Sequence, residues 1–474
     1  MSESTVHNQE NIKKYTAVLI AQYLKKQGYD DTLKSFLRES SIPMSVVAAD
    51  NDSTAQGDDL NSIISERVSY NDHILQNKLK DLSLNEQLPP IDSNRYSLKR
   101  WNFDCKFNNI KSRNIDGIPI NANFCENDED NIMVSTSTRQ LEVCNSDLTP
   151  MTQLKDQQNK SFGIVKFAGP IVGSNNYFVC SMFGEIVLYD ESFKPLPGSA
   201  FKPHERMVTH IQFSKIGANA WYMLTASRDN TLKLNILTLL NDENGITNPT
   251  FNEIWSTKLL STCTTLNMTN TKVNINGAQI TKTVFLLTRM DFTHVVCYTI
   301  DNDKHEVENC FKIALNNAQF STHSFNVRDI VLINTENDEN ENDCITDGTI
   351  IIVATSHIPY MRLVMLEFPG LTSWLTEKPD TVKTYYDTIL RNIATQIPQD
   401  SYSQPIMRYV RKFNGIIIGS DKGIYAIDLL DGESWKLNTT TDLDSQRIKS
   451  IGINQSKLEL VIGTAMKTIY HCNI

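Results

Sequence analysis

The sequence lacks long apolar segments. No run approaches the roughly 20 apolar residues that a membrane-spanning helix needs, and no apolar signal region stands near the N-terminus. The nine cysteines are scattered singly, without a CxxC pair or a metal-like cluster of Cys and His. These absences predict reduced core thiols in a cytoplasmic or nuclear protein, with no disulfide framework, no metal and no membrane contact.

Basic residues are outnumbered by acidic residues. The 474 residues include 45 Lys and Arg against 55 Asp and Glu, a formal net charge of -10. This balance argues against direct nucleic-acid binding and is compatible with basic protein partners. The length has room for a small N-terminal module and one large domain, or for three ordinary domains.

Motifs that carry chemistry are scarce. No Gly-rich phosphate loop, HExxH or paired-carboxylate motif stands out. His204, Ser227 and Asp229 are the residue types of a hydrolytic triad, but a structural explanation given below accounts for all three. The acid-rich stretch Asn334 to Asp343 has a spacing unlike a calcium loop and is expected to be a solvated insertion. We therefore expect no catalytic residues, no cofactor and no metal.

Two short amphipathic helices are predicted between Tyr15 and Ser41. The first has apolar side chains three and four residues apart, and Gly28 ends it in a position that suits a left-handed C-cap. Asp30 or Asp31 is expected to cap the second helix, and Pro43 to end it. Because helices this short gain stability mainly by packing, the pair needs a partner, and the simplest is a second copy.

The same stretch resembles the lissencephaly-homology (LisH) motif. The resemblance rests on residues at the expected offsets: Leu19, Ile20, Tyr23, Leu24, Gly28, Tyr29, Thr32, Ser35, Phe36 and Glu39. It departs at Thr16 and Leu33, where the family usually has Leu and Ala. The resemblance implies a helical hairpin that forms a homodimer, or a heterodimer with another LisH protein. The implied dimerisation residues are Leu19, Ile20, Leu24, Tyr29, Leu33, Phe36 and Leu37.

Three segments are expected before the large domain. Residues 1–11 are polar and aperiodic, which predicts a disordered tail, and residues 12–43 form the hairpin. Residues 44–94 are expected to be a linker that contains an amphipathic helix at about 58–82. This helix either extends the dimerisation or partner-binding region or lies on its own domain, and the sequence leaves both open.

Residues 95–474 show a mainly β pattern that repeats. Strand-like runs fall into seven pairs of adjacent strands: 131–137 with 140–144, 177–182 with 185–189, 221–227 with 231–237, 282–288 with 294–300, 349–355 with 361–368, 415–420 with 423–429, and 458–464 with 467–472. The first three units follow one another at intervals of roughly 45 residues, and so do the last two. The middle intervals are roughly 60 to 66 residues, so insertions are expected in blades four to six. The repeat predicts a seven-bladed β-propeller.

One unit resembles the WD-repeat family. Residues 201–237 contain a His, a strand, a turn, a strand that ends Thr-Ala-Ser, an Asp and a third strand. In that family a His, a Ser or Thr, an Asp and a Trp form a hydrogen-bonded network within one blade. His204, Thr225 and Asp229 match, whereas Asn235 occupies the Trp position, so the resemblance implies a partial network.

The last unit offers three strands, within residues 447–473. A four-stranded blade therefore lacks its outer strand. The alternating segment Tyr96 to Cys105 is expected to fill this place, because closure of the ring removes exposed sheet edges.

These patterns predict a non-catalytic dimeric scaffold whose propeller binds protein partners. As the resemblance implies, proteins with this domain order serve as subunits of ubiquitin ligases, chromatin corepressors, splicing assemblies or dynein regulators. Substrate recruitment in a ubiquitin ligase is the first expectation. A chromatin or transcription corepressor subunit is the alternative, ahead of a dynein or RNA-processing factor. An enzyme is the competing class, and its mark would be an active-site cluster around the central channel.

Overall fold

The computed structural model describes most of the region predicted to be β and the N-terminal hairpin. Its residues are 16–44, 60, 61, 63–65, 67, 68, 96, 98, 101, 107–125, 131–155, 163–241, 247–275, 278–316, 325–334, 344–370, 382–430, 432–437 and 442–474. The described positions between 60 and 68 are helical. The expected tail at 1–11, the rest of the helix at 58–82 and most of the acid-rich insertion lie outside the described residues.

Two helices form the N-terminal hairpin. Residues 16–26 are helical, Gly28 has a φ of 75°, and α2 (Asp30–Ser40) follows. The expectation that Asp30 or Asp31 caps α2 is wrong, because the N-cap is Tyr29 and makes no side-chain cap hydrogen bond. Both carboxylates instead lie in the first turn, where negative charge favours the helix dipole. The helix ends before Pro43, with Ser41 as a left-handed C-cap.

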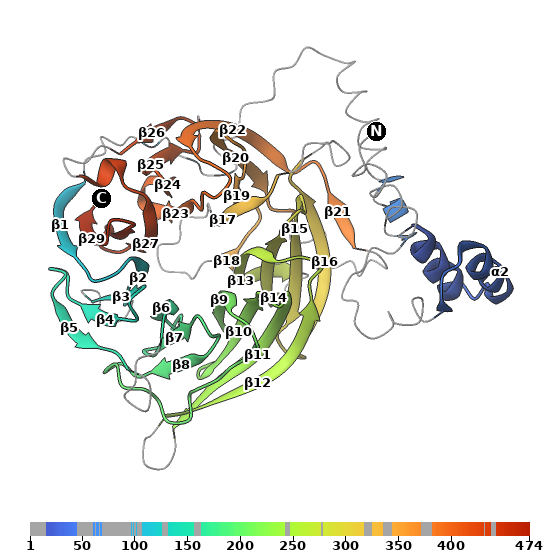
Figure 1. Cartoon of the computed structure of the whole chain (residues 1–474), viewed down its shortest axis with the longest axis horizontal. Helices are drawn as coiled ribbons and strands as arrows, with labels where there is room; N and C mark the ends of the chain where they lie inside the picture. Colours follow the sequence, from blue (N-terminus) through green and yellow to red (C-terminus); the bar gives the residue numbers. More distant parts are fainter. Residues whose placement is uncertain are drawn as a thin grey trace.

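The described strands form seven sheets around a ring, and α2 lies outside this ring (Figure 1). The first three sheets contain β2 (Pro119–Phe124), β3 (Ile132–Thr136), β4 (Leu141–Cys144) and β5 (Pro150–Gln153); β6 (Val165–Pro170), β7 (Tyr177–Ser181) and β8 (Ile186–Tyr189); and β9 (Val208–Lys215), β10 (Ala220–Ser227), β11 (Thr231–Asn241) and β12 (Thr247–Lys258).

The fourth sheet is extended by two short strands that lie, in sequence, between strands of the fifth sheet. The fourth contains β13 (Cys263–Ile275), β14 (Ala278–Arg289), β15 (His294–Asp301), β16 (Glu306–Ala314), β18 (Cys344–Ile345) and β21 (Lys383–Tyr385). The fifth contains β17 (Val327–Ile333), β19 (Ile350–Thr355), β20 (Tyr360–Glu367) and β22 (Ile389–Pro398). Since β18 and β21 come from segments between strands of the fifth sheet and pair in parallel with β13 and β16, insertions of one sheet extend its neighbour.

The sixth and seventh sheets complete the ring. They contain β23 (Ile406–Val410), β24 (Gly415–Ser420), β25 (Gly423–Asp428) and β26 (Ser434–Lys436), then β27 (Ile448–Asn454), β28 (Glu459–Thr464), β29 (Thr468–Asn473) and β1 (Asn108–Asn114). Two 3-10 turns, η1 (Arg411–Phe413) and η2 (Asp442–Ser445), lie in this part of the chain. All seven predicted strand pairs are confirmed as antiparallel pairs.

An N-terminal strand closes the ring, but it is not the one predicted. β1 pairs antiparallel with β29 as the outer strand of the seventh sheet. The expectation that Tyr96 to Cys105 supplies this strand is therefore wrong. Its described side chains are buried elsewhere: Tyr96 and Leu98 pack with the fifth and sixth sheets, and Trp101 packs with the sixth and seventh. The alternation in this segment reflects that burial, whereas β1 is largely exposed and polar because it is an outer strand.

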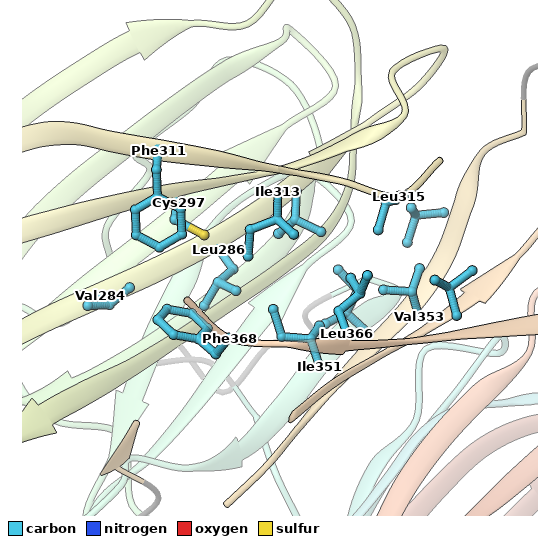
Figure 2. Packing of buried hydrophobic residues seen from close by; sticks show 14 of the residues in the cluster. Val284, Leu286, Cys297, Phe311, Ile313, Leu315, Ile351, Val353, Leu366 and Phe368 are labelled. Atoms are coloured by element: carbon cyan, nitrogen blue, oxygen red, sulfur yellow. The ribbon is translucent and has the colours of Figure 1, made fainter. Parts of the chain in front are cut away.

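The core lies between the faces of neighbouring sheets. Figure 2 shows one such layer, in which side chains from β14, β15 and β16 meet those of β19 and β20. Phe311 and Phe368 meet edge to face, with ring centroids 5.7 Å apart. Such aromatic pairs add about 1 kcal/mol to their burial. Buried apolar surface thus joins the sheets side by side.

Candidate interaction surfaces

The predicted dimerisation residues divide by exposure. Leu33 is 2% exposed and forms the hairpin core with Ala21, while Leu19 is also buried. Leu24, Phe36 and Leu37 pack partly buried against this core, and Ile20 is half-buried. Tyr29 is 53% exposed at the start of α2. In a single chain, Leu33 therefore stabilises the hairpin itself, whereas Tyr29 and the half-buried residues form the surface that a second hairpin would meet.

The predicted blade residues are brought together in the third sheet. The Nε2 atom of His204 lies 2.8 Å from Oγ1 of Thr225, and its Nδ1 lies 2.8 Å from Oγ1 of Thr231. Asp229 accepts the backbone N–H of Thr231 at 2.8 Å and its hydroxyl at 2.5 Å. Burial lowers the pKa of His204, although the nearby Asp229 carboxylate raises it. These contacts hold the β10–β11 turn against the segment that enters the sheet.

Sequence reasoning missed Thr231, which connects His204 to Asp229. The signal was available in the Asp-Asn-Thr order, since an Asp side chain commonly bonds the backbone N–H two residues on. Asn235, at the Trp position of the resemblance, is fully buried, and its amide has no hydrogen-bond partner among the described residues. It therefore takes no part in the network.

Polar side chains on the innermost strands join one sheet to the next. The donors and backbone acceptors are Asn121 to Ala168 (2.7 Å), Lys166 to Val208 (3.2 Å), Gln212 to Leu266 (3.2 Å), Asn267 to Ile330 (3.1 Å) and Arg408 to Ile451 (3.0 Å). Between the fifth and sixth sheets the direction reverses, because the Asp329 carboxylate accepts the N–H of Met407 at 2.7 Å. At β27 and β2 the backbones pack directly: a Cβ on Gly452 would lie 2.7 Å from the carbonyl oxygen of Ala122.

These contacts engage the charged groups of the inner wall. Burial lowers the pKa of Lys166 to about 8, lowers that of Arg408 and raises that of Asp329. All three are bonded to the backbone of a neighbouring sheet. What these groups do in the structure is hold the ring together.

Exposed apolar side chains gather on one face of the ring. Apart from the added strands β1, β18 and β21, the strands of each sheet form an antiparallel meander. The links between sheets and the turns between second and third strands therefore share a face, which we call the link face. Seven large apolar side chains, 46% to 80% exposed, lie there: Phe183, Leu260, Met290, Ile358, Tyr360, Tyr402 and Met466. Among the described residues of the opposite face, Val172 and Leu240 are comparably exposed. The link face is therefore the candidate surface for other proteins.

The sequence alone did not identify the link face. Its apolar residues stand singly in turns, such as Phe183 between Met182 and Gly184, and isolated residues carry no periodic signal. A large apolar residue at the centre of a predicted turn was the available clue, because such positions are exposed.

Among the described residues, no group of three or more His, Cys, Asp or Glu side chains is arranged to hold a metal ion. No helix in the described part of the chain is long and apolar enough to cross a membrane.

The order of a helical hairpin and a ring of β-sheets matches a known family along almost the whole chain. A sequence profile described as UCP007778, LisH domain, matches residues 14–48, and one described as UCP007778, beta-propeller domain, matches residues 82–473. The chain belongs to the UCP007778 family. The LisH resemblance and the propeller expectation are thus confirmed, whereas the profile does not describe WD repeats.

A relative of the UCP007778 chain supports the same assignment. The uncharacterized protein YGR117C of Saccharomyces cerevisiae (strain ATCC 204508 / S288c) is 36% identical over 474 residues. The similarity covers 97% of each chain. The similarity therefore spans both the hairpin and the propeller of this chain.

Proposed function

We propose that this UCP007778 chain is a non-catalytic scaffold that binds other proteins through the link face of its propeller. The observation that carries the proposal is the concentration of exposed apolar side chains on that face. Single exposed apolar residues are ordinary on protein surfaces, but their gathering on one face of a rigid ring is typical of an interaction surface. The side chains of Lys166, Asp329 and Arg408 on the inner wall are bonded to the neighbouring sheets, which favours a structural role for them over catalysis.

The LisH hairpin supplies the second part of the proposal. Two chains joined through their hairpins, as a homodimer or with another LisH protein, present two link faces to one assembly. A partner with two matching epitopes then binds with avidity that neither propeller reaches alone. No direct nucleic-acid or membrane contact, no cofactor and no metal is part of this proposal.

Within the scaffold class we propose a subunit that recruits substrates to a ubiquitin ligase, located in the cytoplasm, the nucleus or both. The support is the LisH-then-propeller order of domains. A chromatin or transcription corepressor subunit is the alternative, because the same domain order supports it. The two differ in the proteins that would accompany the chain.

Affinity purification of the full chain from its native cell tests the proposal. We expect stable protein partners that are lost from a Phe183→Asp, Met466→Asp double variant of the link face. The matched control is Val172→Asp, Leu240→Asp on the opposite face, which should keep them. Recovery of metabolites without stable protein partners would favour the enzyme class. Equal loss of the protein partners in both double variants would show that the link face is not the binding surface.

A further inference from the structure

The exposed apolar residues of the link face are densest between the fifth and sixth sheets. Ile358, Tyr360 and Tyr402 are 62%, 54% and 80% exposed. The first two come from the β19–β20 turn and the third from the β22–β23 link. Gln399 joins these segments, since its N–H donates to the carbonyl of Pro359 at 2.9 Å and its side-chain amide donates to that of Thr355 at 2.8 Å. The β19–β20 turn and the β22–β23 link therefore lie side by side, and we call the exposed surface that carries Ile358, Tyr360 and Tyr402 the Tyr402 platform.

Side chains from β17 and from the segment before β27 bind the backbone of the Tyr402 platform. Arg328, on β17, donates to the carbonyl of Ser401 at 2.7 Å, and Arg447, just before β27, donates to that of Tyr402 at 3.1 Å. Asp400 accepts the N–H of Tyr402 at 2.7 Å. A surface held in this way loses little conformational entropy when a partner binds.

Positive charge surrounds the platform. Its basic neighbours are Arg328, Arg362, Lys422, Arg447 and Lys449. The acidic residues that contacts place here are fewer: Asp400 and Asp421, which both accept hydrogen bonds, and Asp444, whose carbonyl oxygen lies beside Gly423. Asp400 accepts from Tyr402 and Ser403, while Asp421 pairs with Arg447 at 2.7 Å and accepts from the Ser403 hydroxyl. On a chain of net charge -10, this local excess of positive charge favours an acidic partner.

We propose that the Tyr402 platform binds an acidic, extended segment of a protein partner, with an apolar side chain of that segment packed against Tyr402, Tyr360 and Ile358. Tyrosine and arginine are the residue types most enriched where binding energy concentrates, and here both sit on a fixed backbone. This inference rests on the proposed function as a protein-binding scaffold and names the chemistry of the segment bound.

Selection from a random 12-residue peptide library displayed on phage, with the full chain as bait, tests the inference. Enriched peptides should carry net negative charge and an apolar residue. A fluorescent copy of one enriched peptide should bind about tenfold more weakly to Tyr402→Ala, as expected for a hot-spot residue. Lys422→Glu should also weaken it, and added salt should lower its affinity for the wild type.

Leu240→Ala is the matched control, because it truncates an apolar residue that is 54% exposed on the opposite face of the ring. Its peptide affinity should equal that of the wild type. A peptide that binds Tyr402→Ala as tightly as the wild type would overturn the site, and the proposed function would still stand if the link-face double variant loses its protein partners. Failure to enrich any acidic peptide would overturn the proposed partner chemistry. Binding of a 20-nucleotide single-stranded RNA probe to the wild type but not to Tyr402→Ala would also overturn it. Unchanged thermal unfolding of both variants, expected at such exposed positions, shows that folding does not explain a loss.

Discussion

His294 is a buried imidazole at the start of β15. It is 3% exposed, and neither ring nitrogen has a hydrogen-bond partner among the described residues. Burial, together with the positive charges of Lys312 on β16 and Arg289 on β14, lowers its pKa to about 3. Below pH 6.5 the unfolded chain binds a proton that the folded chain refuses, so stability is lost as the pH falls from 6.5 towards 3.

The variant His294→Leu should remove this sensitivity. Near pH 7.5 both states of the wild type carry a neutral imidazole, so the pH-linked cost is absent. At pH 5 it is about 2 kcal/mol, from the 1.5-unit gap below the ordinary histidine pKa. We therefore expect the unfolding temperature of the variant to rise relative to the wild type between pH 7.5 and pH 5. An offset that stays the same at both pH values would contradict this assignment.

At the residue scale, sequence predicts contacts that depend on fixed offsets. His204, Thr225 and Asp229 meet at the offsets of the WD-type unit: His204 precedes β9, Thr225 lies near the end of β10 and Asp229 lies in the turn after it. Tyr402 was not predicted, because its exposure depends on hydrogen bonds from Arg328 and Arg447, which are distant in sequence. A property created by long-range contacts leaves no local pattern.

At the scale of the element, β1 joins the N-terminal part of the propeller to its last sheet. Arg113 on this strand reaches the first sheet, where it pairs with Glu142 and donates to the carbonyl of Leu148 at 2.6 Å. The same guanidinium lies 3.2 Å from the sulfur of Cys144. Burial raises the pKa of that thiol to about 11, so the cysteine is neutral. The strand β1 is thus paired with β29 of the seventh sheet and bonded through Arg113 to the first sheet.

Arg113→Ala should destabilise the propeller by ~1–3 kcal/mol, because it leaves the mostly buried Glu142 carboxylate without its partner. A double-mutant cycle with Glu142→Ala, followed by urea unfolding of the full chain, measures the coupling. The control is Lys111→Ala on the same strand, whose pair with Asp147 is solvent-exposed and should contribute little. Equal effects of the two substitutions would show that the Arg113 pair has no special role in closure.

The closing strand β1 shows why the sequence predicts the positions of central strands better than it predicts which segment forms an outer strand. Central strands such as β7 and β24 are recognisable because both faces are buried and their apolar runs end at turns. β1 is polar and exposed, so nothing in its composition marks it as a strand. Tyr96, Leu98 and Trp101 are apolar because the space between neighbouring sheets requires apolar side chains there.

At the scale of the whole molecule, hairpin and propeller have different tasks in the proposed function. Seven sheets share buried layers and inter-sheet hydrogen bonds, which makes the ring a rigid support for its link face. The hairpin has a small core of its own around Ala21 and Leu33 and keeps Tyr29 exposed. In the proposed function, the hairpin is the part that joins two chains and so doubles the link face.

The molar mass of the full chain in solution, measured by light scattering, tests this central claim most directly. We predict twice the mass of one chain for the wild type and the mass of one chain for Tyr29→Asp, Phe36→Asp, since charges placed at the hairpin surface oppose its burial. The propeller of the variant should keep its unfolding temperature. A single-chain mass for the wild type, or an unchanged double mass in the variant, would contradict the account.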